Sequence, residues 1–217
     1  AVSRFGSDAS QALRVRSAKM LAAAMYLLRG TPFLYQGEEI GMTNFPFRDE
    51  TQLRDVESLN LLAQARKDGR EVWAWNSIRK KGRDNARTPM QWDASANAGF
   101  TAGTPWIDVN PNYRQINVHE AQADPDSILH FYRRLLALRQ GSDALRSGTF
   151  RLLLPENPQL LAYERACGEE RIRVCCNFSG APAVLPSEIQ GDCLLCDGVE
   201  NGRMEPYGLC CVQLLHH

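Results

Sequence analysis

Two adjacent acids, Glu38 and Glu39, are the first residues along the chain that could act as an acid and a base. They lie in a polar loop between Gly37 and Gly41, directly after a short apolar run. A general acid and its partner base must both reach the reacting bond, and neighbouring residues rarely converge in this way. We therefore expect a structural role for both carboxylates, at a helix N-terminus or in an ion pair with a nearby arginine.

A second polar stretch ends at Arg87 and leads into an aromatic segment. The basic run Lys80–Arg87 is followed by Thr88–Asp93, which contains the rigid Pro89 and the aromatic Trp92. Sites that bind sugars combine hydrogen-bond donors for the hydroxyls with an aromatic surface for the ring. Arg87 is thus a candidate ligand-binding residue, and the alternative is a loop arginine whose donors satisfy backbone carbonyls. The residue types alone leave both possibilities open.

Cysteines supply the other reactive side chains. There are seven, and an odd number cannot all pair within one chain, so we expect free thiols rather than a disulfide framework. Cys193 and Cys196 have the spacing of a redox motif or of half a zinc site, but no second CxxC motif and no pair of histidines accompanies them. We expect buried thiols here and no metal site.

Other common motifs of catalytic and nucleotide-binding sites, namely GxSxG, the P-loop, GxGxxG and HExxH, are absent from the sequence.

The overall charge narrows the classes of partner. In 217 residues, 25 basic side chains balance 25 acidic ones, and a neutral chain lacks the extended positive surface that nucleic-acid binding requires. No window approaches the ~18 consecutive apolar residues of a membrane helix, and no secretory apolar segment opens the chain. We expect a cytoplasmic protein without nucleic-acid or membrane partners. The chain begins at Ala1 without a methionine, which suggests an excised segment.

The beginning of the chain has the pattern of an α/β fold. Apolar spacing predicts a helix over residues 10–29, with Gly30 at its end. The short apolar run Thr31–Tyr35 is typical of a strand buried on both faces. In such folds the loops after the strands line the ligand site, so the acidic loop that follows is a place to look for chemistry.

Residues 43–126 have many loop signals and little periodicity, which in a compact protein favours a functional region. Two modest helices are predicted within it, over residues 56–67 and 71–80. A clearer helix is predicted to start at an N-cap Asp124, followed by a proline, and to stop near Gly141.

Beyond Gly141 the pattern changes to short apolar or alternating runs separated by turn residues. These runs are Phe150–Leu154, Leu160–Arg165, Arg171–Phe178, Ala183–Leu185, Asp192–Cys196 and Gly208–Leu214. Strands at this spacing predict a small antiparallel β-sandwich over residues 142–217.

Several stretches resemble one known family, and they occur in that family's order. They are GTPFLYQGEEIGMTN from Gly30 to Asn44, RDVESLN from Arg54 to Asn60, GRDNARTPMQWD from Gly82 to Asp93, AGF from Ala98 to Phe100, and PWIDVNPNY from Pro105 to Tyr113. The chain resembles the oligo-1,6-glucosidase branch of the α-amylase family over essentially its whole length. That branch also includes other α-glucosidases, trehalose-6-phosphate hydrolase and sucrose isomerases.

The resemblance implies an α/β part followed by an all-β part. Residues 1–141 would be the last part of a (β/α)₈ TIM barrel, with Phe33–Tyr35 as its eighth strand and Ile128–Arg139 as its last helix. Residues 142–217 would be the C-terminal antiparallel β-sandwich domain.

The resemblance also implies a reaction. Members hydrolyse α-glucosidic bonds with retention of configuration, using an Asp nucleophile, a Glu acid/base and a further Asp that grips the sugar. The last of these would lie just before Ser3–Gly6, so we expect this chain to lack all three carboxylates and to be inactive alone. Arg87 matches the family's arginine that holds the terminal glucose, and it is the one substrate-binding residue that transfers.

Further expectations follow from the same resemblance. The substrate of the longer parent would be an α-glucosidic oligosaccharide with α-1,6 or related bonds, and trehalose-6-phosphate hydrolase or sucrose isomerase activity are alternatives. No cofactor and no metal are expected.

An alternative of another class is that the chain is a non-catalytic carbohydrate-binding or structural module. Between these two roles, we favour packing for residues 142–217. A truncated barrel would expose apolar surface and an unpaired edge, which favours self-association.

Overall fold

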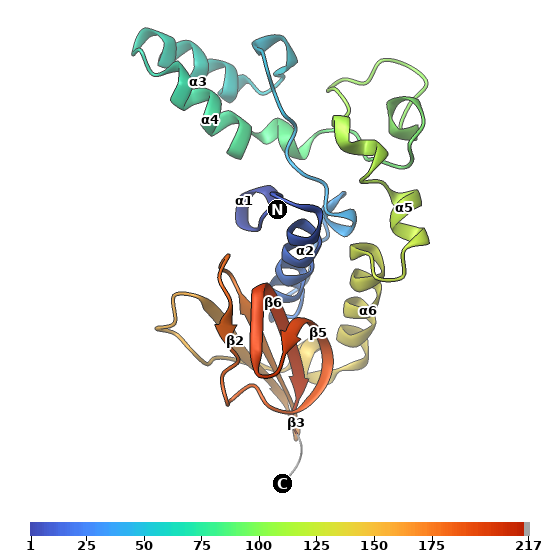
Figure 1. Ribbon diagram of the computed structural model, residues 1–217, viewed down its shortest axis with the longest axis vertical. Coiled ribbons are helices and arrows are strands. Elements are labelled where there is room, and N and C mark those ends of the chain that lie inside the picture. Colours follow the sequence, from blue (N-terminus) through green and yellow to red (C-terminus); the bar gives the residue numbers. More distant parts are fainter. Residues whose placement is uncertain (215–217) are drawn as a thin grey trace. The chain divides into compact units, whose positions relative to one another are not determined.

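The computed structural model describes residues 1–214 (Figure 1). They form two compact units. The first unit combines Ala1–Gly41 with the chain from Asp126 onward, and the second is the intervening segment Met42–Pro125. Among the helices of the described chain, none has both the length and the apolar character needed to cross a membrane.

The first unit is built around α2 (Gln11–Tyr26), which confirms the helix expected over residues 10–29. Ser10 caps its start, because the Ser10 hydroxyl accepts a hydrogen bond from the Leu13 amide at 3.2 Å. Small and apolar side chains leave the second half of α2 buried on nearly all sides. The helix therefore packs both against the sheet and against α6 (Ile128–Gly141) (Figure 1). A single turn, α1 (Val2–Phe5), precedes it.

Helix α6 ends at Gly141 as predicted but begins later than predicted. Asp124 instead follows the end of α5 (Val118–Ala123), and Ser127 is the N-cap of α6. The Ser127 hydroxyl accepts a hydrogen bond from the His130 amide at 3.3 Å. Aspartate and serine are both good N-cap residues, and here the aspartate is used to end one helix rather than to begin the next. The short helix α7 (Asp143–Ser147) leads from α6 to the sheet.

The segment Thr31–Tyr35 is not the buried strand that the sequence predicted. It has no regular secondary structure, and Phe33, Leu34 and Tyr35 are all exposed, Phe33 to 84%. A strand buried on both faces needs a neighbour on each side. Within residues 1–214, every strand belongs to one sheet, and this segment pairs with none of them. The apolar run therefore lacks the partners that would make it a strand.

The rest of the first unit is an antiparallel sheet that contains all six expected strands. They are β1 (Thr149–Leu152), β2 (Leu160–Cys167), β3 (Glu170–Asn177), β4 (Ala183–Val184), β5 (Asp192–Glu200) and β6 (Arg203–Gln213). The strands β1, β2, β3 and β6 follow one another across the sheet, and both β4 and β5 pair with β6. The predicted antiparallel strands of the C-terminal part are thus confirmed, and they form one continuous sheet.

Alternation along the strands gives this sheet an apolar cluster on each face. On one face, Val174 and Cys176 of β3 and Cys211 of β6 pack with α2. On the other face, Cys175 of β3 and Cys210 of β6 pack with residues of the connecting loops. Helix α2 therefore covers one face of the sheet, and the sheet's own loops cover the other.

One pair of cysteines corrects the expectation of free thiols. Cys193 and Cys196 form a disulfide with their Cα atoms 6.5 Å apart, and the other five cysteines are free. Residues three apart in a regular strand point to opposite faces. The pairing of β5 with β6, however, shifts register between Cys193 and Leu195. This bulge changes the alternation by one residue and brings both sulfur atoms to the same side.

The second unit contains a helical hairpin at the predicted place. Helices α3 (Val56–Lys67) and α4 (Glu71–Lys81) face each other with apolar side chains, and Phe47 joins their buried cluster. Apart from α5, the remaining helices are single 3₁₀ turns: η2 (Glu50–Gln52), η3 (Arg83–Ala86), η4 (Ala96–Gly99) and η5 (Pro111–Arg114). The expected long irregular region is therefore present, and it contains Arg87.

Candidate functional site

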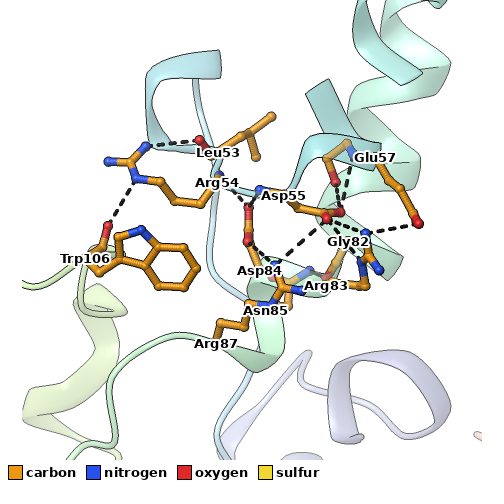
Figure 2. Close-up of polar contacts among 11 residues, drawn as sticks. Leu53, Arg54, Asp55, Glu57, Gly82, Arg83, Asp84, Asn85, Arg87 and Trp106 are labelled. Carbon is orange, nitrogen blue, oxygen red and sulfur yellow. Dashed lines mark hydrogen bonds and ion pairs between the residues drawn. The ribbon is translucent and has the colours of Figure 1, made fainter. Parts of the chain in front are cut away.

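Arg87 directly follows the single turn η3 (Figure 2). Its backbone N–H donates to the carbonyl oxygen of Asp84 at 3.0 Å and closes the turn. The side chain of Asn85 anchors this turn, because its oxygen accepts the Phe45 amide hydrogen at 2.9 Å and its nitrogen donates to carbonyls in the last turn of α4. The backbone that carries Arg87 is therefore held from two directions.

Asp84 links the turn to the start of α3. Its side chain is 1% exposed, and Oδ2 accepts the backbone N–H groups of Arg54 at 2.8 Å and of Asp55 at 2.9 Å. The other oxygen, Oδ1, lies 3.4 Å from Nη1 of Arg87 (Figure 2). A buried carboxylate needs such partners, since its desolvation is costly when it is unpaired.

Asp55 supplies a second buried carboxylate and also caps α3. Its Oδ2 accepts hydrogen bonds from the Ser58 amide at 3.3 Å and from the Ser58 hydroxyl at 2.9 Å. Its Oδ1 accepts two hydrogen bonds from Arg83, at 3.1 Å from Nε and 2.7 Å from Nη2. Burial works to raise the pKa of Asp55, but the hydrogen bonds from Arg83 and Ser58 outweigh burial and hold that pKa below its usual value.

The guanidinium of Arg87 is held on one side and open on the other. Nη1 faces both carboxylates, at 3.4 Å from Asp84 and 3.9 Å from Asp55. Within residues 1–214, no hydrogen bond reaches Nε or Nη2, and the side chain is 36% exposed. A guanidinium is planar and always charged, so these two groups offer a ligand fixed donors in one plane. The arrangement can bind neighbouring hydroxyls or an anionic oxygen.

The sequence identified Arg87 but not the carboxylates that orient it. Asp55 precedes a helical pattern and was recognisable as an N-cap residue, while Asp84 stood in the same motif as Arg87. Neither feature showed that the two would meet at one guanidinium, because 29 residues separate them. The alternative of a loop arginine that satisfies carbonyls describes Arg54 better, since Arg54 donates to the carbonyl oxygens of Leu53 and Trp106 at 3.0 and 3.2 Å (Figure 2).

The aromatic side chains of the motif are exposed. Trp92 is 49% exposed and Trp106 is 63% exposed. Among residues 1–214, the cation–π pairs do not include Arg87 with Trp92. Gln91, next to Trp92, is instead buried and donates to the Ile116 carbonyl at 2.5 Å. The motif therefore contributes both to packing and to an open surface.

Glu38 and Glu39 lie in the first unit, on the single turn η1 (Glu38–Ile40). Both acids lie in the first turn of η1, which is the expected position at a helix N-terminus. Glu38 also has a tyrosine partner rather than an arginine, because the Tyr26 hydroxyl donates to Glu38 Oε2 at 2.5 Å. Burial and this hydrogen bond raise the pKa of Tyr26 well above its usual value. The Oε2 atom of Glu39 is buried without a hydrogen-bond partner in the described chain. The two acids thus have different surroundings although they are adjacent.

No side-chain group suited to a metal ion is formed by the described residues: three or more His, Cys, Asp or Glu side chains do not converge there. Asp55 and Asp84 have their oxygens occupied by backbone amides, a hydroxyl and arginine. The chemistry of the site is therefore that of hydrogen bonding by a positioned guanidinium.

Comparisons with known proteins agree on one family. Residues 1–148 match the model of the alpha-amylase catalytic domain. The oligo-1,6-glucosidase of Parageobacillus thermoglucosidasius is 50% identical over 195 residues, which cover 87% of this chain and 34% of that protein. The chain spans about a third of the length of the curated relatives that it matches.

Solved structures give the same result. The trehalose-6-phosphate hydrolase of Bacillus licheniformis is similar with a TM-score of 0.89 at 41% identity, over 99% of this chain and 41% of that one. The trehalulose synthase of Pseudomonas mesoacidophila MX-45 is similar with a TM-score of 0.88 at 36% identity, over 98% of this chain and 40% of that one.

Proposed function

Because this chain belongs to the alpha-amylase family, we propose that it is the C-terminal portion of a retaining α-glucosidase that hydrolyses α-1,6-glucosidic bonds of short oligosaccharides. Its fold corresponds to part of the TIM-barrel enzymes of this family, and the antiparallel sheet fits their C-terminal portion. The observation that carries the proposal is Arg87, whose guanidinium is oriented by two buried carboxylates and keeps free donors on its exposed side.

Arg87 is proposed to hold a glucose unit of the substrate. Neighbouring hydroxyls of a sugar ring can each accept one hydrogen bond from a planar guanidinium. Asp84 and Asp55 would keep the guanidinium in one orientation, so that little side-chain entropy is lost when the sugar binds. Asp84 and Asp55 are therefore positioning residues in this proposal, and Arg87 is the group that touches the substrate.

The chain alone is proposed to have no turnover. A retaining glycosidase needs two carboxyl groups about 5 Å apart across the scissile bond, one of them free to act as a nucleophile. In the described chain the carboxylates near Arg87 are buried and already bonded, and Glu38 is bonded to Tyr26. Release of p-nitrophenol from p-nitrophenyl α-glucoside by the purified chain should equal that of a blank without protein. Release above the blank would contradict this part of the proposal.

The substrate role of Arg87 can be tested in a fusion enzyme. This chain would replace the matching part of the Parageobacillus thermoglucosidasius oligo-1,6-glucosidase, and the fusion should hydrolyse isomaltose. Replacing Arg87 with alanine should lower kcat/KM by about 100-fold, since hydrogen bonds from a charged group to substrate contribute roughly 1.5–3 kcal/mol each. Arg66 is a matched control in the same unit, because it also bonds two carboxylates, those of Glu50 and Glu71, at 2.6 and 3.0 Å.

The control separates substrate binding from general damage to the unit. Arg66→Ala should change kcat/KM by less than about 2-fold, as expected for an exposed ion pair. Equal losses in the two variants would argue against a substrate role for Arg87. A panel of isomaltose, trehalose 6-phosphate and sucrose would distinguish the proposed hydrolase from the trehalose-6-phosphate hydrolase and sucrose isomerase alternatives.

The division of the chain follows from the same proposal. Residues 1–141 would be barrel and residues 142–217 the C-terminal domain, whose role is packing rather than sugar binding. The sheet supports this role, since its Val174 and Cys176 side chains pack with those of α2. Tyr163 of β2 is buried, although Phe150 and Phe178 are exposed to 42% and 38%. Isomaltose binding that persists in Arg87→Ala and is lost on substituting Phe150 or Phe178 would contradict the packing role.

Two further parts of the proposal concern partners and location. The exposed Phe33, Leu34 and Tyr35 support self-association of the isolated chain, because exposed apolar side chains favour contacts with a second molecule. A monomer in sedimentation at all concentrations would contradict this.

The five free cysteines support a reducing compartment such as the cytoplasm, and fractionation of cells that produce the protein would test the location.

A further inference from the structure

Three sulfur atoms lie next to one another where β5 pairs with β6. Cys193 and Cys196 of β5 form the disulfide, and Cys210 of β6 stands directly opposite Cys196 in the register of the two strands. The Sγ atoms of Cys196 and Cys210 are 3.4 Å apart. A free thiol thus touches one sulfur of a disulfide, and the proposed hydrolysis of glucosides uses neither group.

The surroundings of the three cysteines differ. Cys193 and Cys196 are exposed, so the disulfide is open to solvent. Cys210 is 3% exposed, and burial raises the pKa of its thiol to about 11. Only a small fraction of Cys210 is therefore the nucleophilic thiolate near neutral pH, but that thiolate is formed in contact with its target.

We propose that Cys193, Cys196 and Cys210 form a thiol–disulfide exchange site. The Cys210 thiolate attacks Sγ of Cys196, and the bond between Cys196 and Cys193 breaks. Cys193 leaves as a thiolate and takes up the proton that Cys210 released. The product is a disulfide between Cys196 and Cys210, with Cys193 as a free thiol. One disulfide and one thiol are present before and after, so the step needs no oxidant.

The second disulfide is compatible with the sheet. Directly opposite residues in an antiparallel pair have their Cα atoms roughly 4.5–5.5 Å apart, and a disulfide spans Cα distances of about 4.4–6.8 Å. The exchange would join β5 to β6 covalently and would present Cys193 as an exposed thiol. The Cys193 thiolate can then attack a small disulfide of the glutathione class: a bond forms between Cys193 and one half of that molecule, its S–S bond breaks, and the other half leaves as a thiolate that takes up a proton. This makes Cys193 a site of reversible modification.

Cys175 is the competing thiol that the test must exclude. It stands opposite Cys210 on the other side of β6, in the pairing of β3 with β6. Its side chain is fully buried, and its Sγ lies 3.7 Å from Sδ of Met204. Cys175 lies away from the exposed disulfide, so we assign the exchange to Cys210 and Cys196 alone.

The first test replaces Cys193 with serine in the full chain. Cys193 is exposed, so the variant should fold, and it leaves Cys196 and Cys210 as facing thiols. After oxidation with oxidised glutathione, peptide mapping by mass spectrometry should show a link between Cys196 and Cys210. Cys175 linked to Cys210, or the absence of any link to Cys196, would overturn the proposal.

The second test follows the exchange in the oxidised full chain, using iodoacetamide to trap thiols under native conditions. Cys193 should become alkylated as Cys196 and Cys210 become linked. The variant Cys210→Ala should reduce alkylation of Cys193 at least about tenfold, because the attacking thiol is gone. Cys211→Ala is the matched control, since Cys211 is the next residue of β6, is also buried and belongs to the cluster on the opposite face. Alkylation of Cys193 that is equal in Cys210→Ala and the unmodified sequence would refute the exchange.

Discussion

The guanidinium of Arg165 donates a hydrogen bond from Nη1 to the carbonyl oxygen of Leu27, at 2.8 Å, just past the end of α2. The other two nitrogens of the guanidinium also donate to carbonyl oxygens. Nε lies 3.0 Å from the carbonyl oxygen of Thr149, and Nη2 lies 3.1 Å from that of Gly148. Arg139 of α6 completes the arrangement by donating to the carbonyl oxygens of Tyr26 and Leu28, both at 2.8 Å. The carbonyl end of a helix carries partial negative charge, and two buried arginines from distant elements neutralise it here.

Replacing Arg165 with alanine should destabilise the first unit by about 3–5 kcal/mol, because three carbonyl oxygens would lose their donors and a fully buried side chain would leave a cavity. Arg165→Lys should recover little of this loss, since one ammonium cannot reach three carbonyls that surround a planar group. Urea unfolding followed by circular dichroism would measure both effects.

Arg146 offers the control for this comparison. It is 58% exposed and forms an ion pair with Asp143 on α7. Arg146→Ala should cost less than about 1 kcal/mol, as exposed ion pairs do. Similar losses for Arg146→Ala and Arg165→Ala would show that the helix end does not depend on the buried arginine.

Tyr163 makes a weaker contact with the same helix. Its hydroxyl lies 3.2 Å from the carbonyl oxygen of Ala23 and 3.3 Å from that of Ala24. Tyr163→Phe keeps the buried ring and removes only the hydroxyl, so the free energy of unfolding should fall by about 1 kcal/mol. Tyr207→Phe is the control, because the side chain of Tyr207 is only half-buried. In the same urea experiment, it should lower the free energy of unfolding by less than Tyr163→Phe does.

Glu164 should make the first unit sensitive to acid. This carboxylate is 6% exposed and accepts hydrogen bonds from Arg173 at 2.8 Å and Arg151 at 3.0 Å. Burial works to raise the pKa of Glu164, but these arginines outweigh burial and hold it below its usual value. As the pH falls, Glu164 is therefore protonated in the unfolded chain before it is protonated in the folded protein. The stabilisation of the folded state by the Glu164 carboxylate is complete above about pH 4.3, the ordinary glutamate pKa, and is lost as the pH falls below it.

The variant Glu164→Gln should be less stable than the unmodified sequence at pH 7 and should lose less stability between pH 5 and pH 3, two values on either side of about 4.3. Melting temperatures at a series of pH values would show this as a shallower slope. Glu169→Gln, at an exposed position in the turn after β2, should give the unmodified slope. A slope that is unchanged in Glu164→Gln would place the acid sensitivity elsewhere.

Local patterns in the sequence predicted most of the elements. The helix Val56–Lys67 was predicted near its observed bounds, because its apolar spacing is helical. The strands of the C-terminal domain were predicted because turn residues separate alternating runs. Asp124 and Ser127 are both good caps, and the choice between them depends on α5, which the sequence pattern did not reveal.

Features that depend on distant residues were missed. The Thr31–Tyr35 run was predicted as a strand from its composition, but a strand also requires partners, which the described chain does not provide. The disulfide of Cys193 depends on a bulge, and residue types do not specify a bulge in β5. For the candidate site, the motif pointed to Arg87, while the carboxylate from Asp55 could be placed beside it only in three dimensions.

Asp84 should control both the backbone beside Arg87 and the orientation of its guanidinium. In Asp84→Ala, the amides of Arg54 and Asp55 lose the acceptor that they share, so the second unit should lose about 2–4 kcal/mol. Hydrogen exchange at these two amides should accelerate by more than about tenfold, since each factor of ten corresponds to about 1.4 kcal/mol of opening free energy.

Asp93 provides the comparison, because it also accepts a backbone amide, that of Ser95 at 2.8 Å, but in an exposed turn. Asp93→Ala should leave exchange at Arg54 and Asp55 unchanged. Asp84→Asn should give an intermediate rate, because the amide oxygen can still accept hydrogen bonds while the charge that faces Arg87 is removed. If exchange in Asp84→Ala matched that in Asp93→Ala, the segment beside Arg87 would have to be held by Asn85 and Asp55 instead, and the positioning role assigned to Asp84 would be wrong.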